Sequence, residues 1–296
     1  MKIVYFHTAK GNFGDELNRW LWPRIITRGL TGFTHHGNAN TPIDDPSELW
    51  FYGIGTILDE RIPPDVDKII FGSGFGYGAR PPDIARAKVF FVRGKYTARE
   101  LNLTPDKALT DPAILLRRFF PLIPEHDRIH EISVIPHHSS VKGDFWRRAC
   151  NELGLHYIDP RTADIQRLVE EISASKLVIA EAMHGAIVAD AFRVPWIAIS
   201  SVEETNDFKW RDWCESVGLD YKPTRFTAIY ENTSGSALKN GINAIKLKVR
   251  ERELSKVLKS RCLAQLSDEK LLDTHLRDMD QRLGDLQDYL QQRGVG

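Results

Sequence analysis

The sequence has few cysteines and no excess of either charge. Its three cysteines, Cys150, Cys214 and Cys262, lie far apart and form no Cys-x-x-Cys pair. A disulfide framework or a cysteine-based zinc site is therefore not expected, and a reducing compartment fits. Lys and Arg together number 40, Asp and Glu together number 40, and the formal net charge is zero. This balance argues against a nucleic-acid-binding protein, which would carry a broad basic face.

The sequence also lacks a long hydrophobic run. No run approaches the ~18 apolar residues of a membrane-spanning helix. The first residues, MKIVYFHTAKGNFGDEL, hold only four apolar residues in a row before they become polar, which is too short for the core of a signal peptide. We therefore expect a soluble cytoplasmic protein, and a peripheral position at the inner face of a membrane stays open.

The chain does contain a repeated alternation of short apolar β-runs and helical segments, which predicts an α/β protein. A proline-flanked linker at Phe119–Arg128 divides two successive parallel-sheet domains, 1–125 and 126–232, which imply a cleft between them. A polar helical extension follows at 233–296. The expected strands are Lys2–Phe6, Leu49–Tyr52, Lys68–Phe71, Val89–Val92, Ile132–Ile135, His156–Ile158, Leu177–Ala180 and Trp196–Ile199.

The segment Lys176–Ser200 is the most informative for function. It predicts a strand, a tight turn, a helix opened by Met183-His184-Gly185 and a second strand, which together form a right-handed βαβ unit. Open α/β sheets bind ligands at the carboxyl ends of their strands, and His184 is the polar side chain at this corner. Beside helix N-terminal amides, its imidazole could donate a proton near a bound anion. A helix-capping or core histidine is the competing interpretation.

Two glycine-rich loops follow predicted strands. The first contains Asn12, Gly14 and Asp15, and its amides could hold a phosphate or carboxylate, but it lacks the Gly-Lys-Ser/Thr ending of a P-loop. The second begins at Ser73 and Gly74, where Gly-x-Gly-x-x-Ala is followed by Arg80-Pro81-Pro82 in place of a helix. We reject a dinucleotide site there and expect both loops to line the cleft; the alternative for the glycines of the second loop is that they only turn the chain.

Cations also lie near expected strand ends. Arg93 directly follows a strand, and Arg99 is close behind it, so either guanidinium could bind a carboxylate or phosphate in a bidentate manner. A surface pair with Glu100 is the alternative for Arg99. Lys209 is expected to face the cleft from the second domain. His137, in the His-His pair after Ile132–Ile135, lacks local carboxylate or cysteine partners, so hydrogen bonding to sugar or phosphate is expected there in place of metal binding.

The C-terminal helix carries an apolar stripe. Its members are spaced alternately by four and three residues, as in a coiled-coil seam. We expect this helix to associate with a second copy of the chain as a homodimer; packing along its own domain stays open as the alternative. The stripe consists of Leu272, Leu276, Met279, Leu283, Leu286 and Leu290.

From residue 1 to about residue 222 the chain resembles the polysaccharide pyruvyltransferase family, most of all the bacterial exopolysaccharide (succinoglycan-type) ketal pyruvyltransferases. The order and spacing of several motifs are quite specific, although no single motif is decisive. They are Gly11–Asn18, Gly72-Ser73-Gly74, Arg93 with Thr97, Thr110-Asp111-Pro112, Ser175–Ile179 and Met183-His184-Gly185-Ala186.

The resemblance implies two Rossmann-like domains in a glycosyltransferase-B-like arrangement. It also implies transfer of pyruvate from phosphoenolpyruvate to a sugar of an exopolysaccharide repeat unit, with no cofactor beyond that donor. The family's histidine matches His184 and its arginine matches Arg93; Gly185 follows in the same turn. Some members carry an arginine where this chain has Ala182. Another cation, Lys209 or Arg99, is then expected to meet the donor's charge.

The acceptor is expected to be a lipid-linked oligosaccharide. Two other classes of function stay open. One is a nucleotide-sugar-dependent glycosyltransferase of the same architecture, which a His-Gly corner also suits. The other is a non-catalytic scaffold built around the C-terminal helix.

Overall fold

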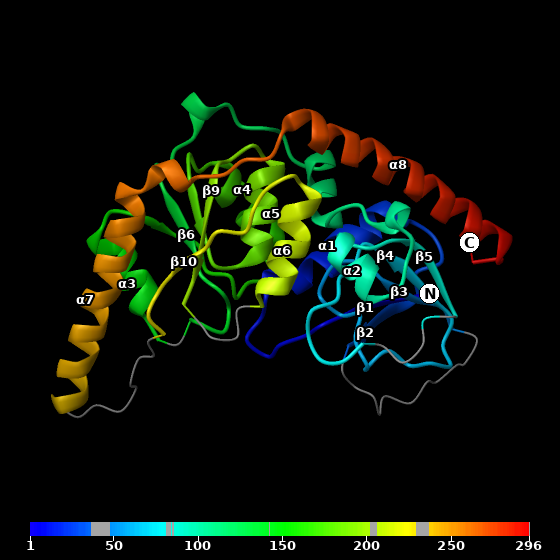
Figure 1. Cartoon of the computed structure of the whole chain (residues 1–296), viewed down its shortest axis with the longest axis horizontal. Coiled ribbons are helices and arrows are strands. Elements are labelled where there is room, and N and C mark those ends of the chain that lie inside the picture. Colours follow the sequence, from blue (N-terminus) through cyan, green and yellow to red (C-terminus); the bar gives the residue numbers. More distant parts are fainter. Residues whose placement is uncertain are drawn as a thin grey trace. The chain divides into compact units, whose positions relative to one another are not determined.

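The chain crosses four times between two structural units. The computed structural model describes residues 1–36, 48–80, 84, 86–141, 143–201, 206–228 and 237–295, with only the backbone of 237–240. The first unit comprises Met1–Leu116, Asn206–Tyr221 and Ser267–Gly296, and the second comprises Arg117–Thr205 and Lys222–Leu266 (Figure 1). The predicted division at residue 125 therefore falls near the first crossing. The prediction placed 206–221 in the second domain and 267–296 in a separate extension, and both segments instead belong to the first unit.

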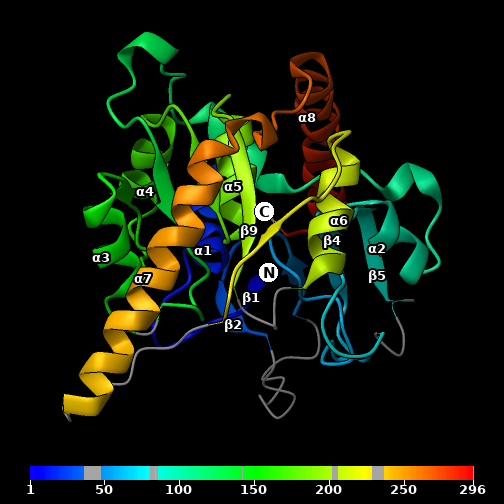
Figure 2. The ribbon, with the colours of Figure 1, turned by 60° about the vertical axis from the view of Figure 1, so that its left-hand side comes forward.

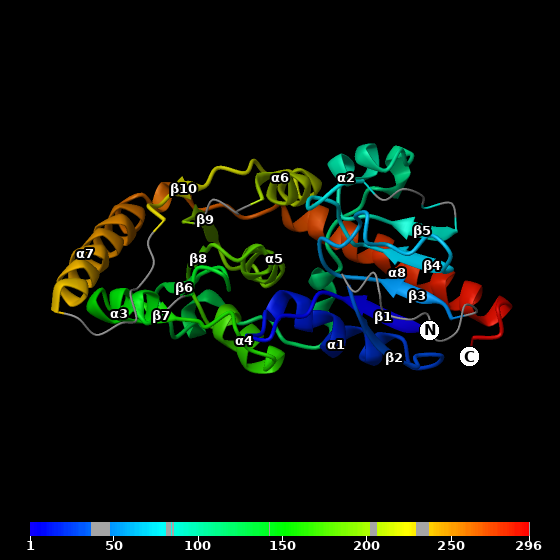
Figure 3. The same ribbon diagram turned by 90° about the horizontal axis from the view of Figure 1, so that it is seen from below.

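The first unit is built on a five-stranded parallel sheet in the order β2-β1-β3-β4-β5 (Figure 3). Short apolar runs form these strands because both faces of a parallel sheet are covered. The strand β2 was not predicted. The strands are β1 (Lys2–Tyr5), β2 (Gly32–His35), β3 (Trp50–Tyr52), β4 (Lys68–Phe71) and β5 (Ala87–Phe91).

Aromatic side chains fill the core of the first unit. Trp22 packs edge-on against Phe51 and Phe71, with ring centroids 4.9 and 5.7 Å away. Pro81 and Pro82, which were predicted to prevent a helix after the second glycine loop, lie outside the described residues. The helices are α1 (Phe13–Ile25), α2 (Lys95–Glu100), α6 (Asp207–Ser216) and α8 (Glu269–Gln292), with 3-10 turns at Pro105–Lys107 and Pro112–Arg118.

The second unit repeats this plan. Its parallel sheet has the order β10-β9-β8-β6-β7. The strands are β6 (Ser133–Ile135), β7 (His156–Tyr157), β8 (Val178–Ala180), β9 (Trp196–Ser200) and β10 (Thr224–Arg225). The helices are α3 (Phe145–Glu152), α4 (Ile165–Ser173), α5 (Met183–Ala191) and α7 (Ala237–Lys259), with 3-10 turns at Glu125–Asp127 and Arg261–Leu263.

The two faces of the second sheet carry different helices. Val134 and Ile179 face a core that α3 and α7 complete through Trp146 and Leu254, and these two helices lie side by side (Figure 2). Ile135 points to the opposite face, where α5 packs against β8 and β9. The α/β prediction with two parallel sheets is confirmed.

Both sheets share one strand order, in which the first strand lies between the second and the third. In the first sheet the chain runs from β1 to its neighbour β2 on one side and then returns to β3 on the other side of β1. In the second sheet β6, β7 and β8 follow the same course, so the strand order reverses between β1 and β3 and between β6 and β8. Open α/β sheets bind ligands outside the carboxyl ends of the strands at such a switch point. The fold thus singles out one edge of each sheet. Among the described helices, none combines the length and apolarity needed to cross a membrane.

The apolar stripe of α8 is buried within its own unit. Met279, Leu283 and Leu286 are between 0% and 5% exposed in the single chain. Arg282 donates to the carbonyls of Phe90 at 2.9 Å and Asp106 at 3.0 Å, which fixes the helix along the first unit. This is packing along its own domain, the alternative interpretation of the stripe. An exposed apolar face therefore no longer supports the predicted homodimer. The four-three spacing did predict five buried residues, whereas the sixth, Leu276, is only half-buried.

His275 of α8 makes the stability of the first unit dependent on pH. The side chain is buried, and its Nε2 donates to the carbonyl of Ser216 in α6 at 2.7 Å. Burial lowers the pKa of His275 below its usual value of about 6.5. The unfolded chain therefore binds this proton more readily than the folded chain. The stabilising contribution is present above about pH 6.5 and is lost as the pH falls from there through the folded pKa.

We expect urea unfolding to show that the wild type loses more stability between pH 7 and pH 5 than a His275→Gln variant. Glutamine can still donate to Ser216 but does not titrate. His126→Gln, in an exposed position on the second unit, is the matched control. Equal pH slopes for wild type and His275→Gln would rule out this role.

Candidate active site

The carboxyl edge of the second sheet places His184 in the first turn of α5. β8 ends at Ala180, two residues intervene, and the helix begins at Met183. The side chain of His184 is half-buried. Gly185 is required beside it, because a Cβ there would lie 2.6 Å from Cγ2 of Ile135. The His-Gly pair therefore lets α5 begin directly against the end of β6 while the imidazole lies at the edge where the helix amides begin.

Glu181 joins three loops at this edge. Its side chain is 1% exposed, and it accepts four hydrogen bonds. Oε2 accepts from the amide of His137 at 2.9 Å and from the hydroxyl of Ser140 at 2.5 Å. Oε1 accepts from the amide and the hydroxyl of Ser201, both at 2.6 Å. Buried and fully engaged, this carboxylate fixes the loops that follow β6 and β9 beside the start of α5.

The loop after β6 brings two further imidazoles to the same edge. Nδ1 of His137 lies 2.7 Å from the hydroxyl of Ser139, and the rings of His137 and His138 are 4.4 Å apart. Since β6 and β8 are neighbours in the sheet, this loop and His184 belong to one rim. Among the residues that the structure describes, no three His, Cys, Asp or Glu side chains are grouped as metal ligands.

A cation from the last strand completes this rim. Arg225 ends β10, is paired in register with Ser200 of β9, and donates from Nη1 to the Ser200 hydroxyl at 3.1 Å. Its side chain is exposed. Strands β8, β9 and β10 are consecutive in the sheet. Two strand spacings, roughly 10 Å, separate the ends of β8 and β10, which a long arginine side chain and a small anion can span.

The corresponding edge of the first sheet is built around α1. Asn18 accepts at Oδ1 from the amide of Ile54 and donates from Nδ2 to the Ile54 carbonyl, at 2.9 and 2.8 Å, which fastens the helix to the end of β3. Asn12 donates to the Asp15 carboxylate at 2.6 Å. Asn12 lies in the loop before α1, and Gly14 and Asp15 lie in the first turn of the helix. All three are therefore beside the switch point of the first sheet.

Ser73 and Gly74 serve the packing of this edge. The hydroxyl of Ser73 is buried and donates to the carbonyl of Gly53 at 2.7 Å, so it ties β4 to β3. A Cβ on Gly74 would lie 2.3 Å from the guanidinium carbon of Arg93. The glycine is therefore required because an arginine lies flat against the backbone.

Arg93 is buried in the first unit. It is 0% exposed, and its Nε donates to Asp212 at 3.2 Å. Nη1 donates to the hydroxyl of Thr56 at 2.9 Å, and Nη2 donates to the carbonyl of Phe75 at 3.2 Å. Asp212 also accepts from the amide and hydroxyl of Thr97, at 2.9 and 2.6 Å. All three guanidinium nitrogens are thus engaged inside the first unit. Donor binding by Arg93 stays a prediction, and it would require some of these contacts to be exchanged for the donor.

Comparisons with known proteins identify the family of this chain. The family model for polysaccharide pyruvyl transferase matches residues 44–201, which include β3, β4 and the whole His184 corner. The succinoglycan biosynthesis protein ExoV of Rhizobium meliloti is 38% identical over 232 residues, covering 76% of this chain and 67% of that protein.

The chain belongs to the polysaccharide pyruvyl transferase family. A more distant relative is the uncharacterized protein L143 of Acanthamoeba polyphaga mimivirus, 24% identical over 230 residues, covering 74% of this chain and 76% of that protein. The family description is that of a transferase that acts on polysaccharide. The family resemblance inferred from the sequence motifs is confirmed.

The two other predicted donor cations lie in the first unit. Lys209 of α6 donates to the hydroxyl of Tyr77 at 2.7 Å and lies 5.2 Å from the centre of that ring. Arg99 is exposed on α2, with its guanidinium 5.9 Å from the Tyr96 ring. Lys209 was predicted to lie in the second domain with His184, and that placement is wrong because α6 returns to the first unit.

Sequence reasoning missed Glu181 and Arg225. Glu181 directly precedes the His184 turn, and a carboxylate between an apolar strand and a helix was the available signal. Arg225 had no such signal, because β10 is only two residues long and was not predicted. In the second unit the structure thus brings together His184, Gly185 and His137, which were predicted, with Glu181 and Arg225, which were not.

Proposed function

We propose that this protein transfers pyruvate from phosphoenolpyruvate to a sugar of an exopolysaccharide repeat unit as a ketal and releases phosphate. The observation that supports the proposal is the half-buried His184 in the first turn of α5, at the switch-point edge of the second sheet. Family membership gives the reaction class, and this edge offers an imidazole, helix amides and a cation for an anionic donor.

His184 acts as the general acid in this proposal. It delivers a proton to the methylene carbon of phosphoenolpyruvate, which becomes a methyl group, and the neighbouring carbon becomes oxocarbenium-like. One sugar hydroxyl adds to that carbon, the bond to the phosphate oxygen breaks, and a second hydroxyl closes the ketal. Two hydroxyl protons are lost, which balances the proton gained by carbon and the proton on the departing hydrogen phosphate. Such acid catalysis contributes a factor of about 10²–10⁴.

Arg225 is the proposed partner of the donor's negative charge. It lies at the same sheet edge as His184, in a chain whose Ala182 cannot supply the cation that some relatives have there. A guanidinium suits a carboxylate or phosphate because its donors form a planar fork. Donor binding by Lys209 or Arg99 stays a prediction, as do the binding roles of Asn12, Gly14 and Asp15.

Glu181 positions this edge without touching the donor. Its four hydrogen bonds hold the loops that carry His137, Ser140 and Ser201, so the histidine and the rim keep one arrangement. A glycosyltransferase-B-like arrangement of the two units and a lipid-linked acceptor stay predictions.

The experiment is phosphate release by the purified full chain, given phosphoenolpyruvate and an extract of lipid-linked oligosaccharide. We expect release only when both are present, and binding heat on titration with phosphoenolpyruvate. Heat with UDP- or GDP-sugars and none with phosphoenolpyruvate would favour the nucleotide-sugar glycosyltransferase instead.

A further inference from the structure

The outward side of α7 carries a row of cations. Lys248, Arg252, Lys256 and Lys259 are spaced by four, four and three residues, so they share one face of the helix, and all four side chains are exposed. Lys248 pairs with Glu251 one turn along at 2.7 Å. Among the residues that the structure describes, the other three cations have no ion pair. This part of the surface is therefore locally basic although the whole chain is neutral.

Apolar side chains lie on the outward side of the same helix. Ile245, three residues before Lys248, is 68% exposed, and Ile242 is 39% exposed. A large aliphatic side chain gains free energy when it leaves water, so Ile245 is poorly placed in a chain that remains wholly in solution. We call Ile245, Lys248, Arg252, Lys256 and Lys259 the cationic face.

The opposite side of α7 packs against the core of the second unit, so the cationic face is directed toward solvent. Leu254 and Val257 are buried in the core of the second unit. Arg250 is also buried, with its guanidinium 4.3 Å from the centre of the Trp146 ring of α3, and it pairs with Glu253 at 3.1 Å. These contacts fix the rotation of the helix, so the cationic face is a defined surface.

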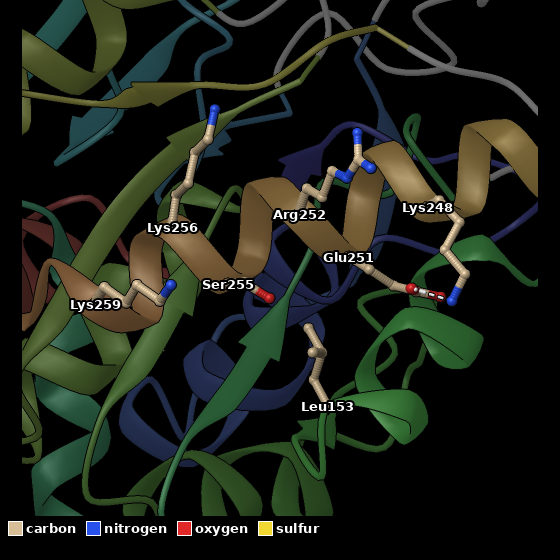
Figure 4. A pocket seen from close by; sticks show the side chains of 7 residues that line it. All are labelled: Leu153, Lys248, Glu251, Arg252, Ser255, Lys256 and Lys259. Atoms are coloured by element: carbon tan, nitrogen blue, oxygen red, sulfur yellow. Dashed lines mark hydrogen bonds and ion pairs between the residues drawn. The ribbon is translucent and has the colours of Figure 1, made fainter.

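A shallow open hollow of about 450 Å³ lies along this surface between α7 and the end of α3 (Figure 4). One aliphatic side chain, one hydroxyl, one carboxylate and four cations line it, which suits the size and charge of a phosphate headgroup. The lining residues are Leu153, Lys248, Glu251, Arg252, Ser255, Lys256 and Lys259.

We propose that the cationic face docks this protein onto an anionic phospholipid bilayer, with Ile245 inserted among the headgroups. A basic helix face with an adjoining aliphatic residue is the pattern of helices that lie in the membrane interface. Nucleic acid fits this face less well, because it offers no aromatic platform and an exposed isoleucine gains nothing from a phosphate backbone. The proposal does not depend on the proposed reaction, because vesicle binding is measured without substrate.

The test is sedimentation of the full chain with vesicles of phosphatidylcholine alone and with vesicles of equal parts phosphatidylcholine and phosphatidylglycerol. We expect binding to the mixed vesicles only. Each cation removed weakens partition roughly fivefold, so Arg252→Gln with Lys256→Gln lowers it about 25-fold. Ile245→Ser lowers it with no change of charge. Lys270→Gln with Arg277→Gln removes two exposed cations of α8 and is the charge-matched control.

Circular dichroism confirms that each variant is folded. The proposal is overturned by a wild type that stays in the supernatant with mixed vesicles, and by a control that loses as much binding as the Arg252/Lys256 double variant. Binding of duplex DNA without binding of mixed vesicles at the same salt concentration also overturns it.

Discussion

Replacing His184 by alanine lowers the rate of phosphate release by a factor of about 10²–10⁴ while phosphoenolpyruvate still binds. The imidazole is the proposed proton donor, so its loss removes an interaction made in the transition state and leaves the ground-state contacts of the donor in place. Single-turnover phosphate release measures the chemical step, and titration calorimetry measures binding. His126→Ala, on an exposed side chain of the same unit, is the control and keeps wild-type rates.

Arg225→Ala is expected to weaken donor binding more than it slows the chemical step, which is the reverse of His184→Ala. A lost charged hydrogen bond leaves the donor's anion unpaired, so the KM for phosphoenolpyruvate rises while kcat changes less. Equal loss of donor binding in the two variants would make His184 a donor ligand and not the acid. Wild-type activity in His184→Ala would remove the mechanism and favour a scaffold role.

The sequence predicted most of the strands because each is a short, continuous apolar run, as in a parallel sheet that is covered on both faces. Lys68–Phe71 was predicted with the observed bounds of β4, and the βαβ unit around His184 was predicted within one or two residues. The strands β2 and β10 were missed. Gly32–His35 alternates weakly and begins with glycine, and Thr224–Arg225 is too short to show any period.

The contacts that decide the roles of the charged residues were not predictable from neighbouring residues. Arg93 meets Asp212, 119 positions later in the chain. Nothing in the composition of 206–221 indicates that α6 returns to the first unit, so Lys209 was assigned to the wrong one. The stripe of α8 shows the same limit, because its spacing predicts most of the buried side chains but not which surface covers them.

Breaking the buried Arg93–Asp212 ion pair is expected to destabilise the first unit strongly. Both side chains are 0% exposed, and removal of one partner leaves the other charge uncompensated in the interior. We expect Asp212→Ala to lower the free energy of unfolding of the first unit by about 3–5 kcal/mol, and Arg93→Ala to do the same. Urea unfolding of the full chain measures both. Arg99→Ala, on the exposed surface of α2, stays within about 0.5 kcal/mol of the wild type.

A double variant distinguishes two possible roles of Arg93, namely stabilising the first unit and binding the donor. Arg93→Met with Asp212→Asn removes both charges, and the amide oxygen of asparagine can still accept from the amide of Thr97. This double variant is therefore expected to recover much of the stability that either single change loses. If Arg93 is structural, this double variant also keeps its affinity for phosphoenolpyruvate, because no donor contact has been removed. A folded double variant that no longer binds phosphoenolpyruvate would return Arg93 to the donor site and show that its buried pair opens when the substrate arrives.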